Sequence, residues 1–225
     1  MPPPRSAQTP HRCVAGLACA LIVALCGCGR AGDAGADPSA AEQIAARLGL
    51  AATALPAPLP RPAFTLEDTS GKPFDFRTAT AGRLTLLFFG YTSCPDVCPG
   101  HLSSLAAGLR ALPQAVRDEV VVVFVGVDAP RDTRERVRAW LDHFDPRFVG
   151  LTGSEAELAA AERASAVPAS FVDDRWQDGY SVAHASWILV YTRDDQAHLR
   201  YPFGTSPEQW SHDLLALARE GWPPA

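Results

Sequence analysis

Two cysteines with three residues between them, Cys94 and Cys98, are the most reactive pattern in this chain. They follow an apolar run at 84–89 that is typical of a buried strand, and they precede a stretch from Pro99 with helical periodicity. The start of a helix carries unpaired N–H groups and partial positive charge, which favour a thiolate over a thiol. Two such thiolates either exchange disulfides or bind a soft metal ion.

The first 28 residues have the pattern of a bacterial export signal. Residues 1–12 contain two arginines and no acid, and residues 13–26 are apolar apart from their thiols. This run is shorter than the about 20 apolar residues that a membrane-spanning helix needs. Leu25-Cys26-Gly27-Cys28 is similar to a lipobox, at which the signal is cut before a cysteine that then carries lipid. We expect residues 1–27 to be a lipoprotein-type signal peptide and Cys28 to be lipidated; an uncleaved anchor or a non-lipid signal is the alternative.

Cleavage before Cys28 would remove Cys13, Cys19 and Cys26. Cys94 and Cys98 would then be the two free thiols of the exported chain, so a structural disulfide framework is excluded. In a disulfide-permissive compartment, a single close pair indicates a functional site. The alternative is a small disulfide that closes one loop, which gains little because the loop is so short.

The composition argues against nucleic acid as a partner. The chain has a formal net charge of −5, and the part after residue 27 is more acidic still, because residues 1–27 hold two arginines and no acid. Residues 28–62 are rich in Ala and Pro and predict a flexible tether, with a short helix from about 40 to 50 capped by Ser39. Residues 63–225 are enough for one domain with a proper core.

The order of predicted elements indicates the fold class. Helices are predicted at 99–112, 132–143 (capped by Asp132), 154–165 and 206–219. Strands are predicted at 84–89, 119–127 and 148–151, with hairpins at 64–76 and 187–201 and an irregular connection at 166–182. This order predicts a thioredoxin-like α/β sandwich, with a central mixed sheet, helices on both faces and an N-terminal β-hairpin.

The segment Gly90-Tyr91-Thr92-Ser93-Cys94-Pro95-Asp96-Val97-Cys98-Pro99 closely resembles the copper-site segment of the Sco (SenC-type) family. Residues 125–133 and 144–153 are similar to two further blocks of that family, and His184 stands where the family places its distal histidine. The resemblance runs from about residue 64 to about residue 217. It implies that Cys94, Cys98 and His184 bind copper, as Cu(I) and as a candidate also Cu(II).

By the same resemblance, the chain would deliver copper to the dinuclear copper centre of cytochrome c oxidase, or to another periplasmic copper protein. It would act on the periplasmic side of a bacterial membrane, held there by its lipid. The chemistry agrees, since Cu(I) prefers soft thiolates and accepts an imidazole as third ligand. Where the family usually has a carboxylate before its histidine, this chain has Ala183, so Asp173, Asp174 and Asp178 are candidates to orient the imidazole.

Two other functions stay open, and neither assigns catalytic residues beyond the redox pair of cysteines. One is a thiol–disulfide reductase that keeps the cysteines of a target protein reduced, and the other is a redox or copper sensor. His101, three residues after Cys98, is either a further ligand or an exposed helical histidine. We expect His143, His198 and His212 to lie at the surface.

Overall fold

The apolar run after residue 83 forms strand β4 (Leu84–Gly90), in which all seven residues are buried. It lies inside an eight-stranded sheet in the computed structural model, which describes residues 38–174 and 179–223. On one side β4 pairs in parallel with β5 (Val120–Gly126), which pairs in parallel with β6 (Val149–Thr152). On the other side it pairs antiparallel with β9 (Trp187–Tyr191). The carboxyl ends of β4 and β5 therefore meet at one edge of the sheet.

Antiparallel strands complete the sheet on both sides, so the predicted mixed sheet is confirmed. Its order is β1-β10-β9-β4-β5-β6-β2-β3. The predicted N-terminal hairpin is β2 (Thr65–Asp68) with β3 (Pro73–Asp75), and the predicted second hairpin is β9 with β10 (Gln196–Pro202). The parallel β4-β5-β6 unit provides the frame on which the cysteine loop is built.

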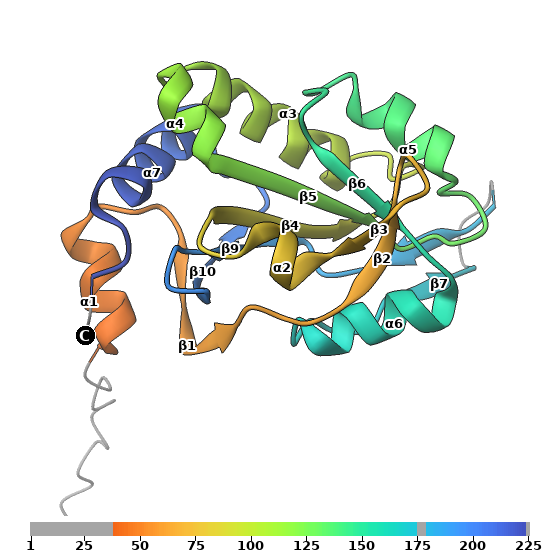
Figure 1. Cartoon of the computed structure of the whole chain (residues 1–225), viewed down its shortest axis with the longest axis horizontal. Helices are drawn as coiled ribbons and strands as arrows, with labels where there is room; N and C mark the ends of the chain where they lie inside the picture. Colours follow the sequence, from red (N-terminus) through yellow and green to blue (C-terminus); the bar gives the residue numbers. More distant parts are fainter. Residues whose placement is uncertain (1–37, 175–178, 224–225) are drawn as a thin grey trace, which may run out of the picture. The chain divides into compact units, whose positions relative to one another are not determined.

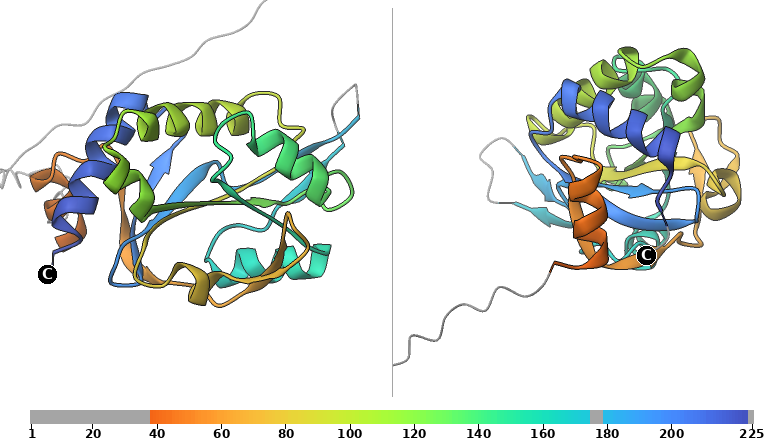
Figure 2. Two further views of the ribbon diagram at one scale, coloured as in Figure 1. Left: turned by 45° about the horizontal axis from the view of Figure 1, so that its top comes forward. Right: turned by 90° about the vertical axis from the view of Figure 1, so that its left-hand side faces the viewer.

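Helices cover both faces of the sheet, as the thioredoxin-like prediction requires (Figures 1 and 2). One face carries α3 (Val97–Arg110), α5 (Arg134–Leu141) and α7 (Pro207–Glu220), whereas α6 (Glu155–Ala164) lies on the other. Short helices α2 (Phe76–Thr80) and α4 (Gln114–Glu119) each lead directly into or out of a strand. None of the helices in the described residues is both long and apolar enough to span a bilayer.

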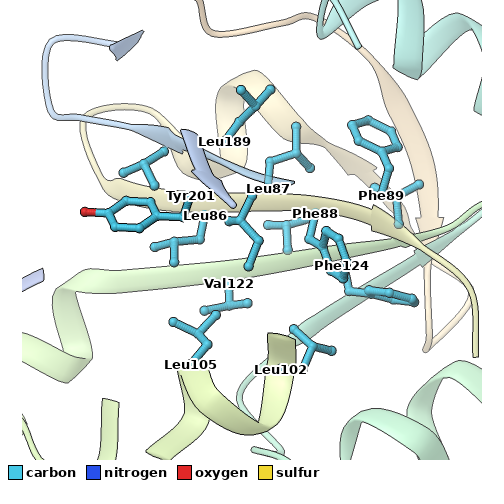
Figure 3. Packing of buried hydrophobic residues seen from close by; sticks show 14 of the residues in the cluster. Leu86, Leu87, Phe88, Phe89, Leu102, Leu105, Val122, Phe124, Leu189 and Tyr201 are labelled. Carbon is cyan, nitrogen blue, oxygen red and sulfur yellow. The ribbon is translucent and has the colours of Figure 1, made fainter. Parts of the chain in front are cut away.

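The core lies on both sides of β4, which explains why the run is apolar without alternation. Figure 3 shows Leu87 and Phe89 pointing to one side of the strand, while Leu102 and Leu105 of α3 approach from the other side. All four side chains are at most 2% exposed. Burial on both faces is the expected environment of a strand with parallel neighbours covered by helices. Strand β4 is thus a rigid support that ends just before the cysteine segment.

The structure differs from the expected tether over residues 38–62. Helix α1 (Ala40–Arg47) has the expected Ser39 cap, but Ile44 and Ala45 are buried. Strand β1 (Thr53–Pro60) pairs with β10 as an edge strand of the sheet. Its prolines predicted an extended path, and they are tolerated in the sheet because an edge strand need not donate every N–H group to a neighbour. Residues 1–37, including Cys28 and the expected signal peptide, lie outside the described residues.

Two local predictions are wrong. Helix α5 is capped by Thr133, whose side chain accepts the N–H of Arg136, and Asp132 is buried and bonded elsewhere. The expected irregular connection contains a small antiparallel sheet of β7 (Phe171–Asp173) and β8 (Ser181–Ala183). Strand β8 ends at Ala183, directly before His184.

Candidate metal centre

The two cysteines lie at the junction between β4 and α3. Cys94 is half-buried in the loop, and its N–H donates to the carbonyl oxygen of Tyr91 at 3.2 Å, which closes a tight turn. Cys98 is the second residue of α3 and is fully buried. Its backbone N–H lies 3.4 Å from the Sγ atom of Cys94. The start of the helix is therefore directed at the first sulfur, as the sequence predicted.

His184 comes from the connection between β8 and β9 and reaches the same place. Its Nε2 atom lies 3.4 Å from the Sγ atom of Cys98, and its ring packs edge-on against the rings of Tyr91 and Phe88. The two sulfurs and one imidazole nitrogen all lie within 4.8 Å of one another. Within the part of the chain that the structure describes, this is the group of cysteine, histidine and acidic residues placed to hold a metal ion.

The tautomer of His184 follows from its second nitrogen. Nδ1 lies 3.0 Å from the carbonyl oxygen of Ala185, and a carbonyl can only accept, so Nδ1 carries the proton. In the neutral ring the lone pair then lies on Nε2, which faces the sulfurs at 3.4 Å from the Sγ atom of Cys98. This backbone contact orients the imidazole, the role that we expected of a carboxylate near residue 183.

The two thiols differ sharply in acidity. The hydrogen bond from the thiol of Cys98 holds the pKa of Cys94 well below its usual range, and backbone N–H groups at the start of α3 act in the same direction. Burial raises the pKa of Cys98, and the neighbouring charge of Cys94 raises it further. At neutral pH the pair therefore holds one thiolate at Cys94 and one thiol at Cys98.

A second hydrogen-bond network fixes the loop before the cysteines. Asp132 accepts hydrogen bonds from both the N–H and the hydroxyl of Thr92, at 3.0 and 2.6 Å. Arg136 donates to the hydroxyls of Thr92 and Ser93. Asp132 was predicted only as a helix cap. Its position in the sequence could have indicated its contact with Thr92. Asp132 follows β5 and Thr92 follows β4, and the carboxyl ends of these neighbouring parallel strands meet.

Arg131 ties the segment before β8 to the thiol loop. Its guanidinium lies 3.8 Å from the ring centroid of Tyr180 and 5.7 Å from that of Tyr91. It forms an ion pair with Asp128, which also accepts a 2.9 Å hydrogen bond from the Tyr180 hydroxyl. Because Tyr91 packs on His184, this cluster supports the approach of the β8 connection to the cysteines.

Other predicted site residues lie elsewhere or take other roles. We predicted that His101 is either a ligand or an exposed residue. It is buried, with 1% of its surface exposed, and it does not belong to the three-residue cluster. His198 is also buried rather than at the surface, stacked on Trp222 and bonded to Asp194. His143 is exposed, and the exposed side chain of His212 bonds to Asp213. Of the carboxylates considered, none of those described belongs to the three-residue cluster, and Asp178 lies outside the described residues.

The donor set determines which metals fit. Two sulfurs and one imidazole, without a carboxylate, form a soft site with low coordination number. Such a site suits Cu(I) and disfavours Mg²⁺ and Ca²⁺, which require oxygen ligands. The same pair of sulfurs can also exchange disulfides, because the partly exposed Cys94 is ionised and Cys98 lies behind it.

Comparisons with known proteins show the family of this chain. The family model described as SCO1/SenC matches residues 53–219. The structure of Bradyrhizobium japonicum ScoI with copper bound is 33% identical, with a TM-score of 0.62 over 70% of this chain and 98% of that one. Apo Sco1 from Thermus thermophilus is 31% identical, with a TM-score of 0.62 over 76% and 96% of the two chains.

A mitochondrial SCO1 homologue of Arabidopsis thaliana is 38% identical over 136 residues, which is 60% of this chain and 38% of that protein. The matching region thus spans less than half the length of that relative. The family match begins at the first residue of β1, which agrees with the finding that this strand is part of the sheet. The match covers most of the chain, including both cysteines and the histidine, and the chain therefore belongs to the SCO1/SenC family.

Proposed function

We propose that this chain is a copper chaperone that holds Cu(I) between Cys94, Cys98 and His184 and passes it to another protein. The observation that carries the proposal is the convergence of two sulfurs and one imidazole nitrogen within 4.8 Å. Support comes from the copper bound in the ScoI structures of B. japonicum and A. thaliana, both of this family. The recipient is the copper-centre subunit of cytochrome c oxidase or another periplasmic copper protein.

Transfer requires that the ligands be released one after another. Cys94 and His184 are half-buried, whereas Cys98 is enclosed by the core. A recipient thiolate or imidazole can therefore approach on the side of Cys94 and His184 and replace one of these two ligands before Cys98. A three-coordinate Cu(I) ion has room for a fourth soft ligand, so the incoming donor can bind before a ligand of this chain leaves.

The test is Cu(I) binding by competition with a chromophoric chelator without oxygen. The protein is the full chain in which the other four cysteines are changed to serine, here called the quadruple-serine protein: Cys13→Ser, Cys19→Ser, Cys26→Ser and Cys28→Ser. We expect one Cu(I) per chain, loss of tight binding in Cys94→Ser, and weaker binding in His184→Ala. His143→Ala, which changes an exposed histidine away from the cluster, is the matched control. Unchanged affinity in Cys94→Ser would overturn the proposal.

A second candidate function is thiol–disulfide reduction of a target protein, with Cys94 as the attacking thiolate and Cys98 as the resolving thiol. The unequal acidity of the two thiols favours it, because an ionised, partly exposed thiol in front of a buried one is the arrangement such exchange needs. This function does not need His184. If His184→Ala abolished reduction of a model disulfide, reductase activity independent of the metal ligand would be excluded.

The proposed site of action is the periplasmic side of a bacterial membrane, with lipid on Cys28. The lipobox-like sequence supports this, and the folded part begins close behind it, since Ser39 already caps α1. About ten residues between them span at most about 35 Å when extended. A chain expressed with a labelled fatty acid should become labelled, and Cys28→Ser should not. A Cys28→Ser chain that carried equal label would exclude this anchor.

A further inference from the structure

His101 is a buried histidine that the three-ligand site leaves without a role. It is 1% exposed and lies on α3, three residues after Cys98, on the same face of the helix. Its ring packs against the rings of Phe88 and Phe203, with centroid distances of 5.3 and 5.6 Å. Burying a histidine is costly unless its polar atoms are bonded, so the partner of this ring is informative.

That partner belongs to the connection that carries His184. Nε2 of His101 lies 3.1 Å from the carbonyl oxygen of Ser186, and since a carbonyl only accepts, Nε2 donates. Ser186 is two residues after His184 and directly follows Ala185, whose carbonyl oxygen accepts the Nδ1 proton of His184. Two consecutive carbonyl groups are thus each held by a histidine, one from α3 and one from the connection itself.

We propose that His101 is a positioning residue for the copper site, which fixes the 184–186 backbone so that His184 presents its Nε2 lone pair to the sulfurs. The inference rests on the proposed copper binding. The first five residues of α3 supply both the buried sulfur ligand, Cys98, and the hydrogen bond from His101 that places the third ligand. One helix therefore carries Cys98 and also anchors the 184–186 backbone, in addition to the support that the Arg131 cluster gives to the β8 connection.

Phe203 completes the arrangement by covering His101. A side chain at Gly100 would come within 2.9 Å of the Phe203 ring, so the glycine leaves room for this ring on the first turn of α3. Phe203 is 45% exposed and separates His101 from solvent. Without water as a competitor, the hydrogen bond from His101 to Ser186 gains in strength.

The test compares variants that keep or remove the donor, in the quadruple-serine protein. His101→Gln places an amide N–H near the position of Nε2, whereas His101→Leu fills the space without a donor. The matched control is Ser104→Ala, which removes another hydrogen bond from α3 to a carbonyl, that of Thr205 at 2.5 Å, away from His184. If His101→Leu does not fold, His101→Asn replaces it, because its shorter amide cannot reach Ser186.

Two readouts separate this inference from the proposed function. The first needs no copper: nitrogen NMR of the apo protein should show His184 as the Nδ1–H tautomer in the starting protein, His101→Gln and Ser104→Ala, and a mixture in His101→Leu. The second is Cu(I) competition, in which His101→Leu should bind about 10–100-fold more weakly, as is typical when a ligand loses its orienting partner. His101→Gln should restore most of the affinity.

The outcomes are distinct. If the quadruple-serine protein binds no Cu(I), the proposed function fails, whatever the NMR result. If it binds Cu(I) and His101→Leu keeps both the His184 tautomer and the affinity, the positioning role is overturned and the chaperone remains. If His101→Leu and Ser104→Ala weakened Cu(I) binding equally, the effect would come from a general loss of stability. That result would also overturn the positioning role.

Discussion

The backbone N–H of Cys98 lies 3.4 Å from the Sγ atom of Cys94, so the first cysteine receives a hydrogen bond from the helix that the second one begins. Asp96, at the N-cap position, makes no side-chain hydrogen bond to the helix. The sulfur of Cys94 thus takes one of the unpaired N–H groups that a polar side chain normally caps. The helix start stabilises charge on Cys94, while burial opposes charge on Cys98.

Alkylation should reveal this difference. We expect iodoacetamide to modify Cys94 of the quadruple-serine protein at a rate that changes little between pH 6 and 8, because the lowered pKa keeps this thiol ionised throughout. An ordinary thiol, with a pKa of about 8.5, would react about a hundredfold faster at the higher pH. Peptide mass spectrometry after timed quenching identifies the modified residue.

The control is the same reaction in denaturant, where both cysteines should react with ordinary pH dependence. Faster modification of Cys98 than of Cys94 in the native protein would contradict the assignment of the thiolate.

Copper loading should release about one proton per Cu(I) at pH 7. The reason is that Cys94 is already a thiolate, whereas Cys98, with its raised pKa, must lose a proton to become a ligand. Between pH 7 and 8 the affinity for Cu(I) should therefore rise about tenfold rather than about a hundredfold. Calorimetry in two buffers of different ionisation enthalpy measures the proton count. Release of two protons would show that both cysteines are thiols in the apo protein.

Gly90, the last residue of β4, should be required for the position of Cys98. A Cβ atom there would lie 2.8 Å from the Sγ atom of Cys98 and 3.0 Å from the Phe124 ring. Gly90→Ala should lower the free energy of unfolding by about 1–3 kcal/mol, as overpacking does, and should weaken Cu(I) binding. Urea denaturation of the apo protein measures the first effect.

A double-mutant cycle identifies the clash. In a Cys98→Ala background the sulfur is absent, so Gly90→Ala should cost less, the remainder coming from the Phe124 ring. If Gly90→Ala lowered the free energy of unfolding equally with and without Cys98→Ala, the clash would not involve the Cys98 sulfur.

The sequence predicted what depends on neighbouring residues in the chain. An unbroken apolar run indicated a buried strand, and the cysteine spacing after it indicated a helix start. The resemblance then supplied the distant ligand, His184. The prediction of a flexible tether was wrong for residues 38–62, because their proline content was interpreted as flexibility. Prolines are equally compatible with an edge strand such as β1. Only the partner strand, about 140 residues later, decides between them.

The positions of His101 and Asp132 could not be predicted in the same way. Whether a helical histidine is exposed depends on which side of the helix faces the sheet, and apolar neighbours on both faces of α3 leave this open. The hydrogen-bond partner of His101 is a backbone carbonyl, and because every residue has one, the sequence does not show which carbonyl it is. Asp132 satisfied the local rule for a helix cap, and a contact with a loop 40 residues earlier took precedence.

His101 should make the stability of the apo protein depend on pH. Burial lowers its pKa in the folded state below the ordinary value of 6.5. As pH falls from 7.5 to 5, the unfolded chain takes up a proton that the native residue resists, so the free energy of unfolding should fall, by at most about 1.4 kcal/mol per pH unit. His101→Gln should lose this contribution, which urea denaturation at several pH values measures. Parallel pH profiles of the two proteins would be inconsistent with a neutral, buried His101.

Truncation should show that the domain begins before β1. A chain starting at Asp37 keeps α1 and β1, whereas a chain starting at Ala63 loses both and also loses Arg61, which is 2% exposed. The Arg61 side chain donates to Thr80, to Asp195 and to the carbonyl oxygens of Arg83 and Thr192. Each buried acceptor left without a donor costs about 1–3 kcal/mol, a large part of a typical stability of about 5–15 kcal/mol.

The shorter chain would also expose β10 as a new sheet edge, which promotes association between chains. We expect the chain from Asp37 to be monomeric and to unfold cooperatively, and the chain from Ala63 to aggregate or to melt at a much lower temperature. Arg61→Met in the longer chain separates the two causes, because it removes the guanidinium and keeps the strand. If the chain from Ala63 were as stable as the longer one, residues 38–62 would be a tether after all.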